Sequence, residues 1–416
     1  MSKILIMQHY SRNKGNVSLL YALVESIKAH IPRAQVVVSS FDPAQTAKLF
    51  GYASCEWPFN TRRAVNARGV RRVLWVAGEI LLAAVQVATA LLVRMRLLNP
   101  ARLSGRFAVI REMCSADLMV SPGGHLFTTL NRLGQFFAHF FHCLMCVLLK
   151  RRYAVIAQTI GPFSGRFRIP DLMMTRFVLK HAAYVSFRDE GTFETLRKHG
   201  IHTDKAAATN EIVFLFPEPS IRRRGAADRP VVGVTIHHLY YKRWMSKERY
   251  LAEMADLIGR ITGELGGRVR LISMEDNTTG RGDMPFIREL VAALGDADEV
   301  EIVDTSMDPR ELLAVVADLD MLVATKTHSV VYGLRMKVPT LAIAYDQKTH
   351  DFMGRFGQSR YSIALDGLTA EGAFARLQEL AGRRQRVREE LARGLEAVAE
   401  QAMENIRAIE RLLGDN

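Results

Sequence analysis

The stretch Asp320-Met-Leu-Val-Ala-Thr-Lys-Thr-His-Ser-Val-Val-Tyr-Gly333 decides the fold of this 416-residue chain. Its pattern predicts a buried strand, a basic turn and the first turns of a helix. A second apolar strand follows and ends at Tyr345-Asp-Gln-Lys348. A helix N-terminus carries free N–H groups and partial positive charge, so Lys326 and His328 placed there predict an anion site. The histidine also supplies a titratable proton donor beside the anion.

Composition bounds the class of protein and its partners. The chain is 49% hydrophobic and 24% charged, as globular proteins are, and is long enough for two domains. The net charge of +13 favours an anionic partner. We find no nucleic-acid motif or zinc-finger spacing, so we expect no nucleic-acid partner. The N-terminus enters a strand directly, without a signal peptide, so a cytoplasmic protein is expected.

One CxxC pair, Cys143 and Cys146, lies inside an apolar run that also holds His139 and His142. Four cysteines in a chain of this length do not form a disulfide framework. Because no second pair accompanies the CxxC, we interpret these thiols and histidines as core residues and expect no metal.

Strand-like runs alternate with helical patterns, which predicts an α/β architecture with parallel sheets. Residues 217–230 carry three prolines and no periodicity, which is typical of a linker. We predict a first domain at 1–217, a second at 231–368 and a C-terminal helix in 369–416 that packs back on the first domain. Two doubly wound, Rossmann-like domains facing a cleft would bind ligands at the carboxyl ends of their strands.

Residues 73–93 form a mostly apolar segment that is long enough to span a bilayer. However, Arg72, Glu79 and Gln86 recur every seven residues and share one helix face, and Glu79 would be costly in hydrocarbon. A core helix and a helix on a membrane surface both remain open, and spanning is the least expected. The basic residues of segment 62–106 suit an anionic membrane surface or a solvated face equally: Arg62, Arg63, Arg68, Arg71, Arg72, Arg94 and Arg96.

Other predicted strands also end in small or charged residues. Glycine there permits either close approach to a substrate or a plain tight turn. These positions are Asn13, Gly15 and Asn16 after the first strand, Gly123 and Gly124 after residues 118–121, and Gly161 after residues 153–159. Asp189, which follows Arg188, is best interpreted from sequence alone as a helix cap. His237 follows the strand at 231–236.

Together these segments resemble the polysaccharide pyruvyl transferase family over nearly the whole chain, and the colanic-acid type most. The matching pieces are Asn13-x-Gly15-Asn16, Ala116-Asp117-Leu-Met-Val-Ser-Pro-Gly123-Gly124, Gln158-Thr-Ile-Gly161-Pro162-Phe163, Ser186-Phe-Arg188-Asp189, Glu194-x-Leu196-x-x-x-Gly200-Ile201, Thr325-x-x-His328-Ser329 and Pro339-x-x-Ala342-Ile-Ala-Tyr345-Asp346-x-Lys348. The resemblance implies a fold like GT-B glycosyltransferases. It also implies transfer of pyruvate from phosphoenolpyruvate to two sugar hydroxyls, giving a cyclic ketal. The chain departs from the usual family residues at Lys326 and His237, where arginine is frequent, and at Asn16, where aspartate is usual.

The resemblance and the chemistry of the donor assign roles to residues. Phosphoenolpyruvate carries a phosphate and a carboxylate, so Lys326, Lys348 and His237 are expected to supply cations. His328 is expected to protonate the methylene carbon. The base for the sugar hydroxyls is Asp189 or Glu211, and the sequence does not choose. Further expected substrate-binding residues are Thr327, Asn13, Gly15, Asn16, Gly123, Gly124, Gly161 and Arg188.

No cofactor is expected beyond phosphoenolpyruvate as donor substrate. The family implies a lipid-linked oligosaccharide or polysaccharide acceptor, and a peripheral position on the inner face of the plasma membrane would suit it. Two rival functions remain open. One is a GT-B-like glycosyltransferase that uses a nucleotide sugar, with Glu311 or Asp346 holding the ribose. The other is a non-catalytic relative in polysaccharide assembly, which the replaced arginines favour.

Overall fold

The computed structural model describes most of the chain. The described residues are 2–7, 13–60, 67, 69–129, 136–218, 229–238, 240–275, 282–295 and 298–414. Of the arginines expected around the apolar segment, Arg62, Arg63 and Arg68 therefore lie outside the described residues.

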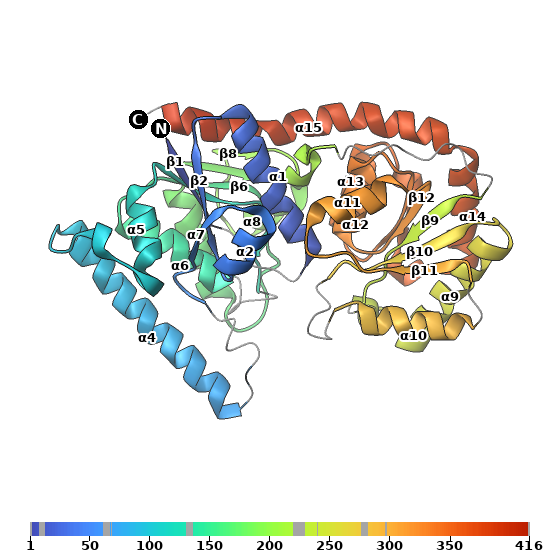
Figure 1. Cartoon of the computed structure of the whole chain (residues 1–416), viewed down its shortest axis with the longest axis horizontal. Coiled ribbons are helices and arrows are strands. Elements are labelled where there is room, and N and C mark those ends of the chain that lie inside the picture. Colours follow the sequence, from blue (N-terminus) through green and yellow to red (C-terminus); the bar gives the residue numbers. More distant parts are fainter. Residues whose placement is uncertain are drawn as a thin grey trace. The chain divides into compact units, whose positions relative to one another are not determined.

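The chain forms two compact units (Figure 1). Unit 1 contains Met1–Tyr10, Leu19–Leu215 and Gln401–Asn416, and unit 2 contains Ser11–Ser18 and Phe216–Glu400. The chain thus passes into unit 2 next to the segment predicted as a linker. No pattern in the sequence indicates that residues 11–18 belong to the second unit.

Unit 1 is built on a parallel sheet with strand order β3-β2-β1-β4-β6-β7-β8, and β5 pairs with β6. Its strands are β1 (Lys3–Met7), β2 (Gln35–Ser40), β3 (Ala53–Glu56), β4 (Leu118–Ser121), β5 (Gly124–Phe127), β6 (Tyr153–Ile160), β7 (Tyr184–Phe187) and β8 (Ala206–Ala208). The strand order reverses between β1 and β4, which is the switch point of a doubly wound fold.

Helices connect these strands. They are α1 (Lys14–His30), α2 (Pro43–Phe50), α4 (Gly69–Arg94), α5 (Ala108–Ser115), α6 (Phe137–Leu148), α7 (Arg168–His181) and α8 (Glu190–Lys198). Local sequence sets their ends, as α2 illustrates. Asp42 accepts a hydrogen bond from Gln45 N, Pro43 occupies the first turn, and Gly51 ends the helix in the left-handed conformation.

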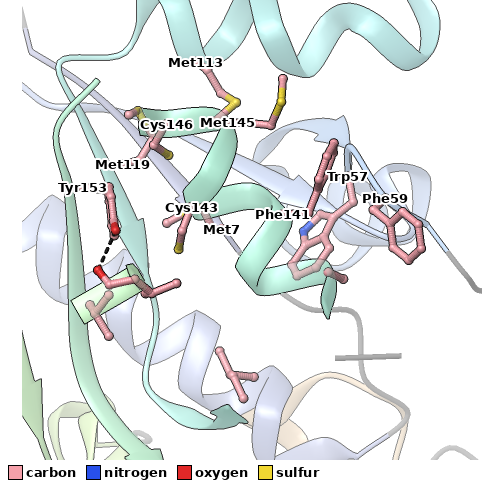
Figure 2. Packing of buried hydrophobic residues seen from close by; sticks show 14 of the residues in the cluster. Met7, Trp57, Phe59, Met113, Met119, Phe141, Cys143, Met145, Cys146 and Tyr153 are labelled. Atoms are coloured by element: carbon pink, nitrogen blue, oxygen red, sulfur yellow. Dashed lines mark hydrogen bonds between the residues drawn. The ribbon is translucent and has the colours of Figure 1, made fainter. Parts of the chain in front are cut away.

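The core of unit 1 gathers around α6 (Figure 2). Cys143 and Cys146 are fully buried, and burial raises the pKa of both thiols, so they stay protonated. His142 is also fully buried and meets the ring of Trp57 edge-on, with centroids 5.2 Å apart. The hydroxyl of Tyr153 donates to the carbonyl of Val178 at 2.6 Å. The interpretation of the CxxC segment as core is confirmed.

Unit 2 repeats the pattern with a parallel sheet of order β11-β10-β9-β12-β13-β14. The strands are β9 (Val231–Val234), β10 (Arg268–Ile272), β11 (Val300–Val303), β12 (Met321–Ala324), β13 (Thr340–Ala344) and β14 (Ser362–Ala364). The helices are α9 (Lys247–Gly263), α10 (Met284–Leu294), α11 (Pro309–Ala317), α12 (Thr327–Arg335), α13 (Gln347–Arg355) and α14 (Ala370–Gly382). The order reverses between β9 and β12, so ligands are expected at the carboxyl ends of these strands.

The long C-terminal helix is α15 (Arg384–Gly414). Only its part from Gln401 onward belongs to unit 1, whereas α14 and the start of α15 belong to unit 2. The buried side chains of Ser186 and Asn405 join β7 to the end of α15 through a hydrogen bond of 2.5 Å. The sequence had placed all of residues 369–416 on the first domain.

Helix α4 is not a core helix, so that interpretation of residues 73–93 is wrong. Its buried residues are Glu79, Ala83, Gln86 and Ala90, and most of its large apolar side chains are exposed. Among the helices of the described residues, α4 is the one whose length and apolar composition would suffice to cross a bilayer.

Candidate functional site

Two helices of unit 2 begin at the carboxyl ends of neighbouring parallel strands. β12 leads into α12 and β13 leads into α13. Thr327, the first residue of α12, bonds through Oγ1 to Thr349 Oγ1 at 3.0 Å and to Tyr345 OH at 3.1 Å. Asp346 caps α13 by accepting from Thr349 N at 3.0 Å. These hydrogen bonds hold the two helix N-termini side by side.

The start of α1 lies against α12 at the same place. Asn13 accepts a hydrogen bond from Gly15 N through Oδ1 at 2.8 Å. A Cβ atom on Gly15 would fall 2.2 Å from His328 Cγ, so the missing side chain makes room for the imidazole. One turn further along, the hydroxyls of Ser18 and Tyr332 share a hydrogen bond of 2.6 Å. Three helix N-termini therefore meet near His328. The N–H groups of Lys14 and Gly15 already donate to Met274 O and Asn13 Oδ1, so α1 adds only its dipole there, whereas α12 and α13 can offer N–H groups to an anion.

Lys326 was expected to bind phosphate, but carboxylates surround it. Its Nζ lies 2.7 Å from Glu275 Oε1 and 2.7 and 2.9 Å from the two oxygens of Asp283. Burial alone would raise the pKa of Asp283. The charge of Lys326 and hydrogen bonds from His238, Lys326 and Met274 N outweigh that effect and lower the pKa to about 2. The positive charge of Lys326 is thus engaged within the protein.

His237 was expected to supply a cation, but its surroundings disfavour the charged form of the imidazole. Burial, followed by the neighbouring charge of Lys326, lowers the pKa of His237 to about 2, so the ring is neutral near pH 7. The ring stands edge-on to Tyr345, with centroids 5.1 Å apart. It lies three residues after the end of β9 and can exchange hydrogen bonds with a ligand, but it adds no positive charge near pH 7.

His238, Glu275 and Asp283 have the spacing of a metal site. Their ligand atoms lie within 4.8 Å of one another, and in the described part of the chain no other three such residues come as close. The Lys326 ammonium binds both carboxylates, so it takes the place that a divalent cation would occupy. Sequence reasoning missed this group because its members come from three separate segments.

Sequence reasoning also missed Lys14, which is fully buried. Its Nζ donates to Ser273 O at 3.0 Å and lies 3.4 Å from Asp304 Oδ1. Its main-chain N–H donates to Met274 O, and Asn13 forms an isolated antiparallel bridge with Glu275. These contacts fix the start of α1 to the segment after β10. The only signal for Lys14 in the sequence was its place inside the Asn13–Asn16 turn. Asn16, also predicted to bind substrate, is the third residue of α1.

The other predicted residues lie in unit 1, where their contacts are structural. Asp189 caps α8 by accepting from Thr192 N at 2.9 Å, which confirms the capping interpretation. Its second oxygen accepts from Thr159 Oγ1. Arg188 forms a buried ion pair with Glu211. Both candidate bases therefore have partners within the protein, and a catalytic role for either stays a prediction.

Tight packing or backbone conformation accounts for the predicted glycines of unit 1. Gly161 has a φ of +90°, and a Cβ there would fall 2.8 Å from Thr195 Cγ2. Gly123 approaches the carbonyl of Ala157, where a Cβ would lie at 3.0 Å. Gly124 opens β5 with a φ of +131°, and this backbone conformation, rather than packing, calls for glycine. These glycines are thus needed for the turns themselves, whether or not a substrate approaches them.

Residues 13–347 match the model of the polysaccharide pyruvyl transferase family. The chain belongs to that family. This match spans all the predicted site residues except Lys348. A curated relative, the amylovoran biosynthesis protein AmsJ of Erwinia amylovora, is 22% identical over 298 residues, covering 67% of this chain and 69% of AmsJ.

Two solved structures that are similar to this chain contain nucleotide sugars. The Anabaena protein HepE in complex with UDP-glucose aligns over 100% of both chains with a TM-score of 0.61 and 11% identity. The UDP-GlcNAc 2-epimerase of Neisseria meningitidis, bound to UDP-GlcNAc, aligns over 98% of this chain and 100% of the epimerase, with a TM-score of 0.58 and 11% identity. At such identities the similarity shows the fold alone. It confirms the predicted pair of parallel-sheet α/β domains of GT-B type.

Proposed function

We propose that this chain transfers pyruvate from phosphoenolpyruvate to two hydroxyls of a sugar and so forms a cyclic ketal. Family membership supports pyruvyl transfer in polysaccharide biosynthesis. The observation that carries the proposal is the position of His328, the second residue of α12, beside the N-termini of α1 and α13. A proton donor and an anion site coincide there.

Backbone groups supply most of the donor site in this proposal. The phosphate and carboxylate of phosphoenolpyruvate accept hydrogen bonds from N–H groups at the N-termini of α12 and α13, and the dipole of α1 adds partial positive charge. Lys348 adds a positive charge. Its side chain is partly exposed, and its Nζ lies 3.3 Å from one carboxylate oxygen of Asp346, which is farther than the 2.7 Å that separates Lys326 from Asp283 and from Glu275. Lys326 instead holds the turn before α12 in place through Asp283 and Glu275. The neutral His237 contributes hydrogen bonds rather than charge.

The chemistry needs a proton donor and two hydroxyls. The protonated imidazole of His328 gives a proton to the methylene carbon, and the adjacent enol carbon becomes electron-poor. One sugar hydroxyl attacks that carbon and loses its proton. The bond from carbon to the phosphate oxygen then breaks, and the second hydroxyl attacks the same carbon and loses its proton. One released proton restores His328, and the other leaves with inorganic phosphate.

The acceptor in this proposal is a lipid-linked oligosaccharide, an intermediate of polysaccharide assembly. Membership in a polysaccharide-modifying family supports a saccharide acceptor, and AmsJ is named for the biosynthesis of one polysaccharide, amylovoran. A lipid-linked acceptor places the reaction at the cytoplasmic face of the plasma membrane.

The polymer of a strain that lacks this chain tests the proposal. We expect its proton NMR spectrum to lose the methyl signal of the pyruvate ketal, and the wild-type gene to restore it. His328→Ala should give soluble protein with an unchanged melting temperature but no ketal, because removal of a general acid lowers kcat by about 100-fold or more. A ketal signal that persists in the deletion strain would refute the proposal.

A nucleotide-sugar glycosyltransferase is the second candidate, and the shared fold with proteins that bind UDP-sugars favours it. The residues expected to hold a ribose already have local partners. Asp346 caps α13, and Glu311 accepts from Ser306 N at 3.1 Å. Thermal unfolding with each ligand separates the two functions, because only the true donor stabilises the folded state. We expect phosphoenolpyruvate to raise the melting temperature and UDP-glucose to leave it unchanged.

A further inference from the structure

Helix α4 turns its polar residues toward the protein and its apolar residues outward. Glu79, Ala83, Gln86 and Ala90 are buried, at spacings that place them on one face. A surface helix of a globular protein normally has the opposite arrangement, with apolar residues inward. The seven-residue recurrence of Glu79 and Gln86 in the sequence therefore marks the face that contacts unit 1.

The inward polar groups are satisfied by unit 1. Glu79 accepts from Asn60 N at 2.9 Å and from the two terminal nitrogens of Arg106 at 3.0 and 2.7 Å. Gln86 donates to the carbonyl of Arg106 at 2.9 Å. The charge of Glu79 is thus paired, and residues 79–90 are fixed along their length to unit 1.

The outward face carries an exposed apolar surface. Between Val73 and Val93 the one charged residue is Glu79, which faces the protein. Exposed large side chains on and just after the helix are Val70, Val73, Leu74, Trp75, Ile80, Leu81, Val85, Leu91, Leu92, Met95 and Leu97. Figure 1 shows the N-terminal half of α4 extending away from the other elements of unit 1. A contiguous apolar surface of this kind marks an interaction site.

Exposed arginines flank this surface at both ends. Arg71 and Arg72 lie in the first turn of α4, Arg94 ends the helix, and Arg96 and Arg102 follow it. Their guanidinium groups can reach lipid phosphates while their stems lie on apolar surface. The residues between Arg72 and Arg94 extend about 30 Å along the helix axis. An apolar face bounded by cations at both ends matches a helix lying in the interface of an anionic bilayer.

We propose that α4 is a membrane-docking helix that lies flat in the headgroup region of an anionic bilayer, with its outward face at the acyl boundary. It does not span, because the contacts of Glu79, Gln86 and Ala90 hold its inner face against unit 1. The proposal rests on the geometry of α4 and is independent of pyruvyl transfer. If α4 does not bind membranes, the proposal of pyruvyl transfer is unaffected, and the converse also holds.

Co-sedimentation with vesicles tests the proposal. The full-length chain should pellet with vesicles of phosphatidylcholine and phosphatidylglycerol at low salt. Leu74→Gln, Ile80→Gln and Leu81→Gln combined should lower the partition coefficient by about 100-fold, from the apolar burial lost. The matched control is Ile302→Gln in β11, another exposed apolar residue, which should pellet like the parent. Arg71→Gln with Arg72→Gln should weaken binding about fivefold per arginine.

Trp75 reports the depth of α4, since it lies on the helix and is 41% exposed. Lipids brominated near the headgroup should quench its fluorescence more strongly than lipids brominated near the chain ends, and Trp75→Phe should remove this quenching. Stronger quenching from the chain ends would mean that the helix spans, and would overturn the flat orientation.

Circular dichroism and thermal unfolding establish that each variant is folded. A folded wild-type protein that stays in the supernatant at low salt overturns the proposal. If sedimentation velocity then shows a dimer that the triple variant loses, a second copy of the chain covers α4 instead.

Discussion

Gly15 and His328 are in direct contact in unit 2, because the imidazole occupies the space that any larger residue at position 15 would fill. A Cβ atom there would lie 2.2, 2.5 and 2.6 Å from three atoms of the ring. These distances are far below ordinary van der Waals contact. The rotamer of His328 and the position of the start of α1 thus depend on one another, although Gly15 and His328 are far apart in the sequence.

Gly15→Ala is expected to abolish ketal formation without unfolding the protein. The new methyl group must displace the imidazole of His328 or shift the start of α1, and either change moves the proton donor. The measurement is kcat together with the melting temperature. Gly259→Ala in α9 is the matched control, since a Cβ there meets no atom within 4 Å. It should leave kcat unchanged and add up to about 1 kcal/mol of stability. Near-normal kcat in Gly15→Ala would contradict the assigned role of this contact.

Asp283→Asn is expected to destabilise the protein by about 3 kcal/mol, because it leaves Lys326 buried with only Glu275. Chemical denaturation measures this change. The control is Asp256→Asn, which breaks an exposed pair with Arg260 and should cost less than about 1 kcal/mol.

The pH dependence of Asp283 has a definite sign. The pKa of this carboxyl is lowered from 3.8 to about 2 in the folded state. The stabilisation is therefore fully present above pH 3.8 and is lost as the pH falls toward 2. The cost of Asp283→Asn should therefore fall as the pH drops from 3.8 toward 2. A cost that stays the same across this acidic range would contradict the assigned ion pair.

The sequence predicted the parts of the site that are local. The strand, turn and helix at residues 320–333 follow from apolar periodicity and a helix start, both of which lie within a few residues. The same holds for Asp189 as a cap, since a cap acts on an N–H three residues away. The partners of Lys326 were not predictable, because Asp283 and Glu275 lie 43 and 51 residues away in segments without a pattern.

For α4, the sequence identified the helix and the shared face of Glu79 and Gln86, but not which face points inward. The periodicity of a sequence predicts which residues share a face of a helix, but it does not predict what that face contacts. The choice depends on Asn60 and Arg106, which provide partners for Glu79 from outside the helix. The assignment of residues 11–18 to unit 2 was missed for a similar reason, since it depends on contacts of Lys14 with Ser273 and Met274.

Lys348 and Lys326 are expected to behave differently when replaced by alanine. Lys348→Ala removes a partly exposed cation at the start of α13, so the KM for phosphoenolpyruvate should rise about tenfold with stability unchanged. Lys326→Ala leaves Asp283 and Glu275 without their shared cation, so it should lower the free energy of unfolding by about 3 kcal/mol. Steady-state kinetics and chemical denaturation on both variants separate the roles. An unchanged KM in Lys348→Ala would mean that another cation binds phosphoenolpyruvate.

His142→Phe is expected to make the protein less sensitive to acid. Burial lowers the pKa of His142 from 6.5 to about 3, so below pH 6.5 the unfolded chain binds a proton that the folded chain does not. Stability is therefore lost as the pH falls from about 6.5 toward 3, by about 1.4 kcal/mol for each pH unit. Phenylalanine preserves the edge-on contact with Trp57 and cannot take up a proton. Chemical denaturation gives the free energy of unfolding of the variant minus that of the parent. This difference should be about 2 kcal/mol larger at about pH 5 than at about pH 8. An equal difference between variant and parent at both pH values would show that His142 does not cause the acid sensitivity.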